Sequence, residues 1–241
     1  MLQVCLNGSR SRVACAHLPI TPHEMATAAR AAVAAGAQDV HLHPKDRDGA
    51  DTLDSTAVAA ALEAVRAAVP GIPVGVTTGA WAAPDPGARA AQVRSWTVLP
   101  DHASVNWHED GATEVATALL DRGVGIEAGI YSGTPAARRF LSWPHADRVL
   151  RVLAEITDTS PQTAVRAAAD LLDELRPGAT SPILLHGEDD AAWPVLQLAA
   201  SRRLDTRIGL EDVLRLPDGT PAESNADLVH AARGIIRLVS P

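Results

Sequence analysis

The 241-residue sequence contains only two cysteines, a single lysine and no long apolar run. Its two cysteines, Cys5 and Cys15, lack partners at metal-ligand spacing and fit a reducing compartment. No run of about 18 apolar residues is present, so we expect no membrane span. The formal net charge of −8 disfavours a nucleic-acid partner. The first residues, Met1 to Leu6, have no basic lead-in, so we expect no export signal and a cytoplasmic location.

Short apolar runs alternate with alanine-rich helical stretches along the whole sequence. We predict strands at residues 2–6, 40–43, 73–77, 102–106, 124–126, 148–156, 182–185 and 206–208. We predict helices at residues 22–35, 56–69, 87–95, 113–121, 161–175, 191–202 and 224–239, with a short one after residue 134. Eight such units indicate an α/β protein, a closed (β/α)8 TIM barrel formed by residues 1–241 as a single domain.

An open, doubly wound sheet is the structural alternative to the barrel. That fold normally places a GxGxxG fingerprint after its first strand, because the glycines let the backbone approach a phosphate. The corresponding stretch here, Leu6-Asn7-Gly8-Ser9-Arg10, lacks this spacing. The barrel is therefore the better prediction.

His41-Leu42-His43 closes the second predicted strand and is a candidate metal-binding pair. Residues two apart on a strand point to the same side, so both imidazoles can face one point. A carboxylate from a distant segment would complete a two-histidine, one-carboxylate set, which leaves a divalent metal an open position for substrate. The spacing alone is equally compatible with two strand-end histidines that are hydrogen-bonded to loops.

Polar or ionisable residues recur at the carboxyl end of every predicted strand, where barrel enzymes build their sites. A solvated loop explains any one of them but explains the whole ring poorly. The ring comprises residues 7–12, His41, His43, Thr77, Thr78, Asn106, His108, Glu127, Glu155, His186 and residues 207–212.

Two motifs in this ring resemble those of the β-keto acid cleavage enzymes. They are His41-Leu42-His43-Pro44-Lys45-Asp46 and the segment Arg207-Ile208-Gly209-Leu210-Glu211-Asp212. Further matches are Pro19-Ile20-Thr21-Pro22-His23-Glu24 and Ala34-Ala35-Gly36-Ala37. The resemblance covers most of the chain, and the first two motifs together are fairly specific.

The resemblance implies a zinc-dependent barrel that exchanges acyl groups between a β-keto acid and acetyl-CoA. The products would be a new acyl-CoA and acetoacetate, and the protein would be a homo-oligomer, a dimer or a tetramer. The family motif places Zn²⁺ ligands at His41, His43 and Glu211. It also places an oxyanion-binding arginine at Arg207 and the carboxylate that takes the substrate proton at Asp212.

The stretch after the first strand departs from the family pattern. Well-studied members carry a glutamate there, whereas this chain has Ser9-Arg10-Ser11-Arg12. Arg10 would suit a second anionic group, such as a dicarboxylate or a CoA phosphate, although a solvated basic loop is an equal alternative. If the loop faces the site, we expect a cationic wall that favours neutral or anionic β-keto acids.

Three other residues are candidate substrate contacts. Thr78 and Asn106 could bind the substrate carboxylate, although polar caps at strand ends are common. Glu127 could support a ligand histidine or pair with an arginine at the barrel mouth.

Two other functions fit the same residues. Lys45, the one lysine, could form a Schiff base in a barrel lyase, although it lies beyond its strand. Alternatively, the barrel could bind a metal and an anionic metabolite without turnover, because the family glutamate is missing.

Overall fold

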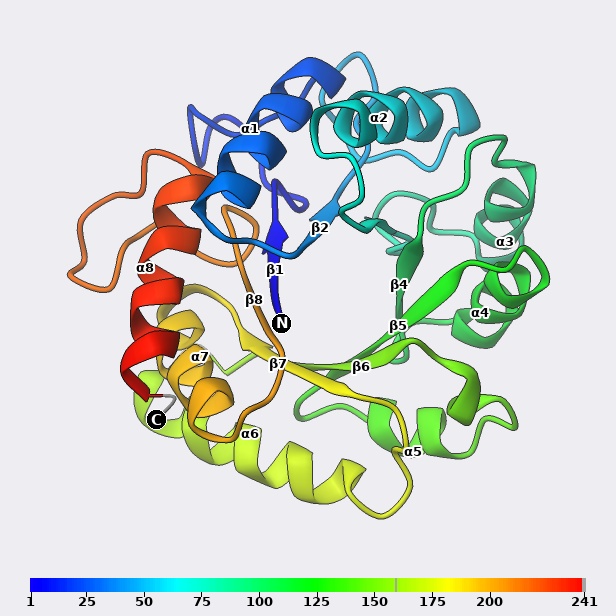
Figure 1. Ribbon diagram of the computed structural model, residues 1–241. Helices are drawn as coiled ribbons and strands as arrows, with labels where there is room; N and C mark the ends of the chain where they lie inside the picture. The colour runs from blue at the N-terminus through cyan, green and yellow to red at the C-terminus, as the bar shows by residue number, and fades with distance from the viewer. Residues whose placement is uncertain (159, 240–241) are drawn as a thin grey trace.

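Eight parallel strands form the wall of a barrel, which Figure 1 shows along its axis. The structure is a computed structural model that describes residues 1–158 and 160–239. The strands are β1 (Leu2–Cys5), β2 (Asp39–Leu42), β3 (Val74–Thr77), β4 (His102–Asn106), β5 (Gly125–Tyr131), β6 (Arg151–Ile156), β7 (Ile183–Gly187) and β8 (Thr206–Ile208). Their order is β7-β6-β5-β4-β3-β2-β1-β8, and a parallel bridge between Leu184 and Asp205 joins the two ends. The predicted TIM barrel is confirmed.

Each strand is followed by a helix, and the helices surround the barrel (Figure 1). They are α1 (Pro22–Ala35), α2 (Ser55–Ala68), α3 (Pro86–Ser95), α4 (Ala112–Asp121), α5 (Ala136–Leu141), α6 (Pro161–Leu175), α7 (Ala192–Ser201) and α8 (Asn225–Val239). Helix α1 shows how local sequence sets a boundary. The Thr21 side chain accepts a hydrogen bond from the Glu24 backbone, and the Glu24 carboxylate accepts one from the Thr21 backbone. Gly36 ends the helix at a φ of 115°.

Strands β4 and β8 have the predicted bounds, whereas β5 and β7 are longer than predicted. The predicted strands end just before a polar residue, which is Glu127 in β5 and His186 in β7. In the closed barrel both side chains are buried, so the strands continue past these residues. Strand β6 starts later than predicted, because residues 146–148 form a 3₁₀ turn before it.

The interior of the barrel near the amino-terminal ends of the strands contains a network of charged side chains instead of an apolar layer. Arg151 donates to Asp39 Oδ2 at 2.6 Å and lies 3.0 Å from Glu127 Oε1. His102 lies between the same carboxylates, 2.9 Å from Asp39 and 3.1 Å from Glu127, and the Gln3 amide donates to both. Each charge in this buried layer therefore faces an opposite charge or a hydrogen-bond partner.

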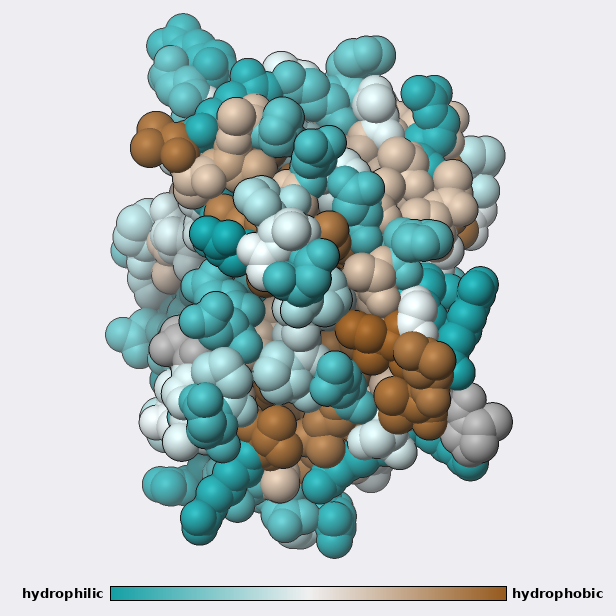
Figure 2. All heavy atoms as spheres, turned by 90° about the vertical axis from the view of Figure 1, so that its left-hand side faces the viewer, coloured by the Kyte–Doolittle hydropathy of each residue, from teal (hydrophilic) through white to brown (hydrophobic). Residues whose placement is uncertain are grey.

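The outer surface shows apolar groups in separate clusters among hydrophilic ones, as Figure 2 illustrates for one side. The large apolar side chains that are exposed are Val13, Trp81, Leu150, Val165, Leu238 and Val239. Over the described residues, no helix has both the length and the apolar character that a membrane crossing requires.

Candidate active site and metal centre

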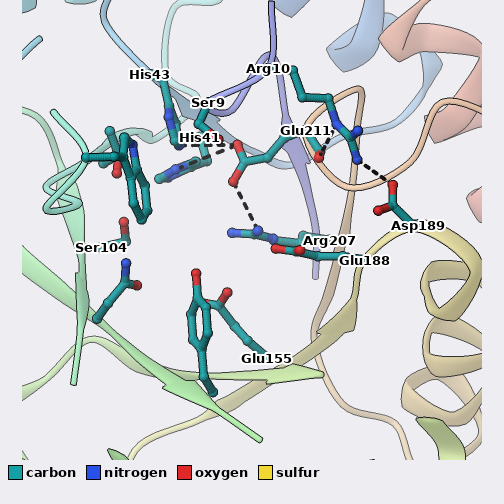
Figure 3. Close-up of a pocket in the computed structure, with 14 residues that line it drawn as sticks. Ser9, Arg10, His41, His43, Ser104, Glu155, Glu188, Asp189, Arg207 and Glu211 are labelled. Atoms are coloured by element: carbon teal, nitrogen blue, oxygen red, sulfur yellow. Dashed lines mark hydrogen bonds and ion pairs between the residues drawn. The ribbon is translucent and has the colours of Figure 1, made fainter. Parts of the chain in front are cut away.

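His41, His43 and Glu211 converge at the carboxyl end of the barrel (Figure 3). His43 Nε2 lies 3.6 Å and His41 Nε2 lies 4.0 Å from Glu211 Oε2. One donor atom from each residue lies within 4.8 Å of the others, and among described residues this is the group with metal-binding geometry. His41 lies in β2, and His43 follows one residue after the strand ends at Leu42, whereas the prediction had His43 close the strand; Glu211 lies in the turn after β8. That turn packs on β1 so closely that a Cβ at Gly209 would overlap the Cys5 backbone.

The donor set fits a divalent cation. Two imidazole nitrogens and one carboxylate leave open coordination positions, as catalytic sites do. Glu211 Oε2 is buried and has no hydrogen-bond partner within the described part of the chain, so it is available as a ligand. Burial lowers the pKa of His41 to about 4, which keeps this imidazole neutral and able to bind a metal.

Asp51 orients His43. Its Oδ2 lies 2.8 Å from His43 Nδ1, which leaves Nε2 directed at Glu211. Lys45 in turn forms a buried ion pair with Asp51 and donates to the Gly8 carbonyl at 2.7 Å. Burial would lower the pKa of His43, but the charge of Glu211 and the hydrogen bond to Asp51 raise it to about 9. This anionic surrounding attracts a proton and would attract a metal cation as well.

Replacing Asp51 is expected to weaken metal binding while leaving all three ligands in place. In Asp51→Asn the charge that fixes His43 is lost, so we expect Zn²⁺ affinity to fall by about 10- to 100-fold. Competition with a chelating dye measures this affinity. Asp48→Asn is the matched control, because Asp48 is exposed in the same loop. Equal affinities of the two variants would show that Asp51 does not support the site.

A cavity of about 340 Å³ opens beside these three residues (Figure 3). Part of the polar ring at the strand ends lines it. The residues that line it are Ser9, Arg10, His41, His43, Thr77, Trp81, Ser104, Asn106, Tyr131, Glu155, Glu188, Asp189, Arg207 and Glu211.

Arg207 and Asp212 form a pair, but only Arg207 lines the cavity. Arg207 Nε donates to Asp212 Oδ1 at 3.0 Å, and its Nη2 donates to Glu211 Oε1 at 3.1 Å. Asp212 is 0% exposed and lies outside the cavity wall. Burial raises the pKa of Asp212 to about 7, although the adjacent Arg207 acts in the opposite direction.

The four predicted substrate contacts divide into two groups. Asn106 and Arg10 line the cavity. Thr78 does not line the cavity, and its hydroxyl donates to the Ser104 carbonyl at 2.6 Å. Its neighbour Thr77 lines the cavity instead, because adjacent residues of an extended chain point to opposite sides. Glu127 also lies away from the cavity, in the charged network, with Oε2 3.7 Å from His41 Nδ1. Its position suits support of a ligand histidine and not contact with substrate.

Of the two arginines in the basic loop, Arg10 lines the cavity and Arg12 does not. Arg10 donates to Asp189 at 2.6 Å and to the Glu211 carbonyl at 2.9 Å, so its charge is partly neutralised. Arg12 lies outside the wall and pairs with Glu24. The wall also contains the carboxylates of Glu155, Glu188 and Glu211, the last of which belongs to the metal-binding set. The preference for neutral or anionic β-keto acids stays a prediction of the sequence.

Sequence reasoning missed several cavity residues. Trp81, which no motif singles out, is 45% exposed, lines the cavity and stacks on the His43 ring with ring centroids 5.8 Å apart. No motif marks Tyr131, which lines the cavity, or Asp51, which lies behind His43. Glu155 belonged to the polar ring but received no role.

Lys45 faces away from the cavity. Its side chain is 1% exposed, it pairs with Asp51, and it is absent from the cavity wall. A Schiff base requires an amine that a carbonyl substrate can reach. This position disfavours the lyase hypothesis.

Comparisons with known proteins give one family match and several fold matches. The family model described as beta-keto acid cleavage enzyme, BKACE, matches residues 1–240. The structure of ObcA with oxaloacetate aligns with a TM-score of 0.75 at 19% identity, over 93% of this chain and 65% of ObcA. This chain thus spans just under two thirds of the length of ObcA. A ternary ObcA complex with a C4-CoA adduct and oxalate aligns with a TM-score of 0.73 at 18% identity, over 90% of this chain and 63% of that chain.

A second enzyme type shares the fold. A type I 3-dehydroquinate dehydratase from Clostridium difficile aligns at a TM-score of 0.67 and 13% identity, over 99% of this chain and 91% of that chain. At these identities the structural matches establish the barrel fold alone.

Proposed function

The chain belongs to the β-keto acid cleavage enzyme family, and from this premise we propose that it exchanges acyl groups between a β-keto acid and acetyl-CoA. In this reaction R–CO–CH₂–COO⁻ and acetyl-CoA give R–CO–S–CoA and acetoacetate. The C2–C3 bond of the keto acid breaks, the released acyl group joins the CoA sulfur, and C2 takes the acetyl group. One proton leaves C2 and one returns, so the reaction needs no oxidant or reductant.

The observation that carries the proposal is the His41–His43–Glu211 set in a cavity wall that also contains Arg207. Zn²⁺ bound by these three residues would act as a Lewis acid toward the 3-keto oxygen. The cavity of about 340 Å³ has room for a small keto acid. The complexes of ObcA with oxaloacetate and with a C4-CoA adduct support a β-keto acid and CoA as small-molecule partners.

Arg207 would bind the substrate carboxylate or a thioester oxyanion. Asp212 and Glu211 hold its guanidinium through Nε and Nη2, which aims a planar cation at the cavity. These two carboxylates also raise its pKa further above the usual range, against the effect of burial, so it stays charged. Asp212, which the family resemblance assigns as the base, lies on the buried side of Arg207, and we assign it the orientation of this arginine.

Arg207→Lys is expected to keep the metal and lower kcat/KM by about a hundredfold. An ammonium does not reproduce two-point contact with a carboxylate, and removing one such oxyanion contact costs about 10²–10³ in rate. Arg12→Lys is the control, because Arg12 lies outside the cavity wall. Near-normal turnover of Arg207→Lys would show that Arg207 is structural.

A panel of β-keto acids tests the function. Metal-loaded protein is incubated with acetyl-CoA and a neutral, an amino-substituted or a dicarboxylic β-keto acid, and acetoacetate formation is measured. We expect turnover with at least one acid, dependence on Zn²⁺, and retained turnover in Lys45→Arg. Loss in Lys45→Arg with metal still bound would favour the Schiff-base lyase. Metal and acid binding without turnover would favour a non-catalytic barrel.

The remaining expectations stay predictions of the sequence: a cytoplasmic location, a homo-oligomer, a single domain over residues 1–241 and no nucleic-acid partner. Size-exclusion chromatography with light scattering measures the oligomeric state.

A further inference from the structure

The loop between β1 and α1 contacts Glu211 at two points. A Cβ at Gly8 would lie 2.5 Å from Glu211 Cγ, so the loop backbone passes directly against this side chain. Gly8 has a φ of 57°, a conformation that glycine adopts without strain. Two residues later, Arg10 Nε donates to the Glu211 carbonyl at 2.9 Å. The loop therefore contacts both the side chain and the backbone of a candidate metal ligand.

Arg10 joins three segments at the carboxyl end of the barrel. Besides its bond to the Glu211 carbonyl, it donates from Nη2 to Asp189 Oδ1 at 2.6 Å and to the Asp212 carbonyl at 3.4 Å. Asp189 follows β7, whereas Glu211 and Asp212 lie in the turn after β8. Figure 3 shows the guanidinium of Arg10 between Glu211 and Asp189. One side chain thus links the segments that follow β1, β7 and β8.

Asp189 contacts the same turn through its backbone. Its N–H donates to the Asp212 carbonyl at 2.7 Å, while its carboxylate accepts the hydrogen bond from Arg10. Asp189 has a φ of 48°, in the left-handed region that aspartate and asparagine tolerate better than other non-glycine residues. Such residues persist where surrounding contacts hold them, and they are frequent at functional sites. The contacts of Asp189 therefore fix the turn that carries Glu211.

A metal ligand on a turn needs a fixed backbone. Metal–ligand distances vary by only about 0.2 Å, so a small shift of the turn moves the carboxylate out of range. The Glu211 N–H donates to the Cys5 carbonyl at 3.3 Å, which is a long bond. The bonds from Arg10 to the Glu211 and Asp212 carbonyls are charge-assisted and hence stronger than bonds between neutral groups.

We propose that Arg10 and Asp189 are positioning residues for Glu211, an inference that rests on the metal centre of the proposed function. Together they fix the turn after β8, so that the Glu211 carboxylate stays within reach of both ligand histidines. The basic loop thereby supports the metal centre, because its arginine is directed at backbone carbonyls of the ligand-bearing turn.

The charges of Arg10 and Asp189 also act on a bound cation, in opposite directions. Loss of the arginine alone leaves an extra negative charge that attracts the cation, whereas loss of the aspartate charge leaves an extra positive one. In the double variant Arg10→Met/Asp189→Asn the two effects cancel, because one charge of each sign is removed. Asparagine also accepts the left-handed backbone at this position. The metal affinity of the double variant therefore reports on the position of the turn.

Competition with a chelating dye measures Zn²⁺ affinity without any turnover. We expect the double variant to bind Zn²⁺ about tenfold more weakly than the wild type, as for the loss of a partner behind a metal ligand. Arg12→Met/Asp190→Asn is the matched control, because both residues are exposed, lie in the same two segments and carry the same charges. We expect its affinity to stay within about twofold of the wild type. Equal affinities of the two double variants would overturn the proposal.

The affinity of the folded protein separates positioning from overall stability. Zn²⁺ binding is measured well below the unfolding temperature, where a modest loss of stability does not change it, and circular dichroism verifies that each variant is folded. Arg10→Lys keeps the charge, but an ammonium does not reproduce the planar fork that reaches three acceptors. We expect an affinity between those of the wild type and the double variant. If the double variant does not fold, Arg10→Lys carries the test, and wild-type affinity there would overturn the proposal.

A second measurement separates positioning from direct contact with substrate. At saturating Zn²⁺, kcat/KM of the Arg10→Met/Asp189→Asn variant is measured with a neutral and with a dicarboxylic β-keto acid. We expect both values to fall by the same factor. A loss confined to the dicarboxylic acid, with Zn²⁺ affinity unchanged, would overturn the proposal and make Arg10 a substrate contact.

The failure of this inference and that of the proposed function are distinguishable. A wild-type protein that binds Zn²⁺ tightly but turns over no β-keto acid would overturn the proposed acyl transfer, and the affinity test would still decide the role of Arg10 and Asp189. A wild-type protein that does not bind Zn²⁺ would overturn the metal centre and this inference together.

Discussion

Glu211→Gln is expected to release the metal and to lower turnover by about a thousandfold or more. The carboxylate supplies the negative charge of the ligand set and lies within 4.0 Å of both ligand histidines. A neutral amide keeps the shape but loses this charge, and the buried histidines alone bind a divalent cation weakly. Loss of Lewis-acid assistance removes several kcal/mol of transition-state stabilisation, and about 4 kcal/mol corresponds to a thousandfold change in rate.

Metal content after gel filtration and acetoacetate formation measure the two effects. Glu223→Gln is the control, because Glu223 is an exposed residue in the loop between β8 and α8. If Glu211→Gln retains one tightly bound metal per chain, Glu211 is not a ligand. If it loses the metal but keeps turnover, the reaction does not use the metal.

Arg151→Met is expected to lower the free energy of unfolding by about 3–5 kcal/mol. Arg151 contacts both Asp39 and Glu127, and the substitution leaves two buried carboxylates with only His102 and the Gln3 amide as partners. Chemical denaturation monitored by circular dichroism measures the change. Arg148→Met is the control, because Arg148 is exposed just before β6. Equal stabilities of the two variants would mean that the network contributes little.

The pH dependence of stability tests the same network through His102. Burial would lower the pKa of His102, but the charges of Glu127 and Asp39 raise it to about 10, above the unfolded value near 6.5. The stability from protonated His102 is therefore fully present below pH 6.5 and is lost as the pH rises through 10. We expect the free energy of unfolding to fall between pH 7 and pH 10, and this slope to be absent in His102→Gln.

Much of the metal centre could be predicted from sequence, because its geometry is local. The two-residue spacing at the end of β2 directs His41, in the strand, and His43, just after it, to one side. The family resemblance supplied Glu211 as the third residue. The support of His43 by Asp51 was not predicted. It depends on a loop that folds back so that Lys45 and Asp51 pair, and no periodicity encodes this.

The residues that line the cavity could not be predicted without the closed barrel. Thr77 and Thr78 are adjacent and chemically identical, and only the orientation of β3 decides that Thr77 lines the cavity. Arg207 and Asp212 were both expected at the site, but the turn after β8 places Asp212 behind the arginine. Glu155 and His186 lie 3.7 Å apart because β6 and β7 pair in register at these two residues.

The sequence by itself determined the alternation of strands and helices, the start of α1 directly after Thr21 and the shared side of His41 and His43. These features depend on contacts within a few residues, where backbone sterics and hydrogen bonding limit the choices. Only the tertiary structure decided which carboxylates reach the cavity and which are buried in the network of Asp39, Glu127 and Arg151. Those outcomes depend on strand register and barrel closure, which bring together side chains that lie more than 100 residues apart in the chain.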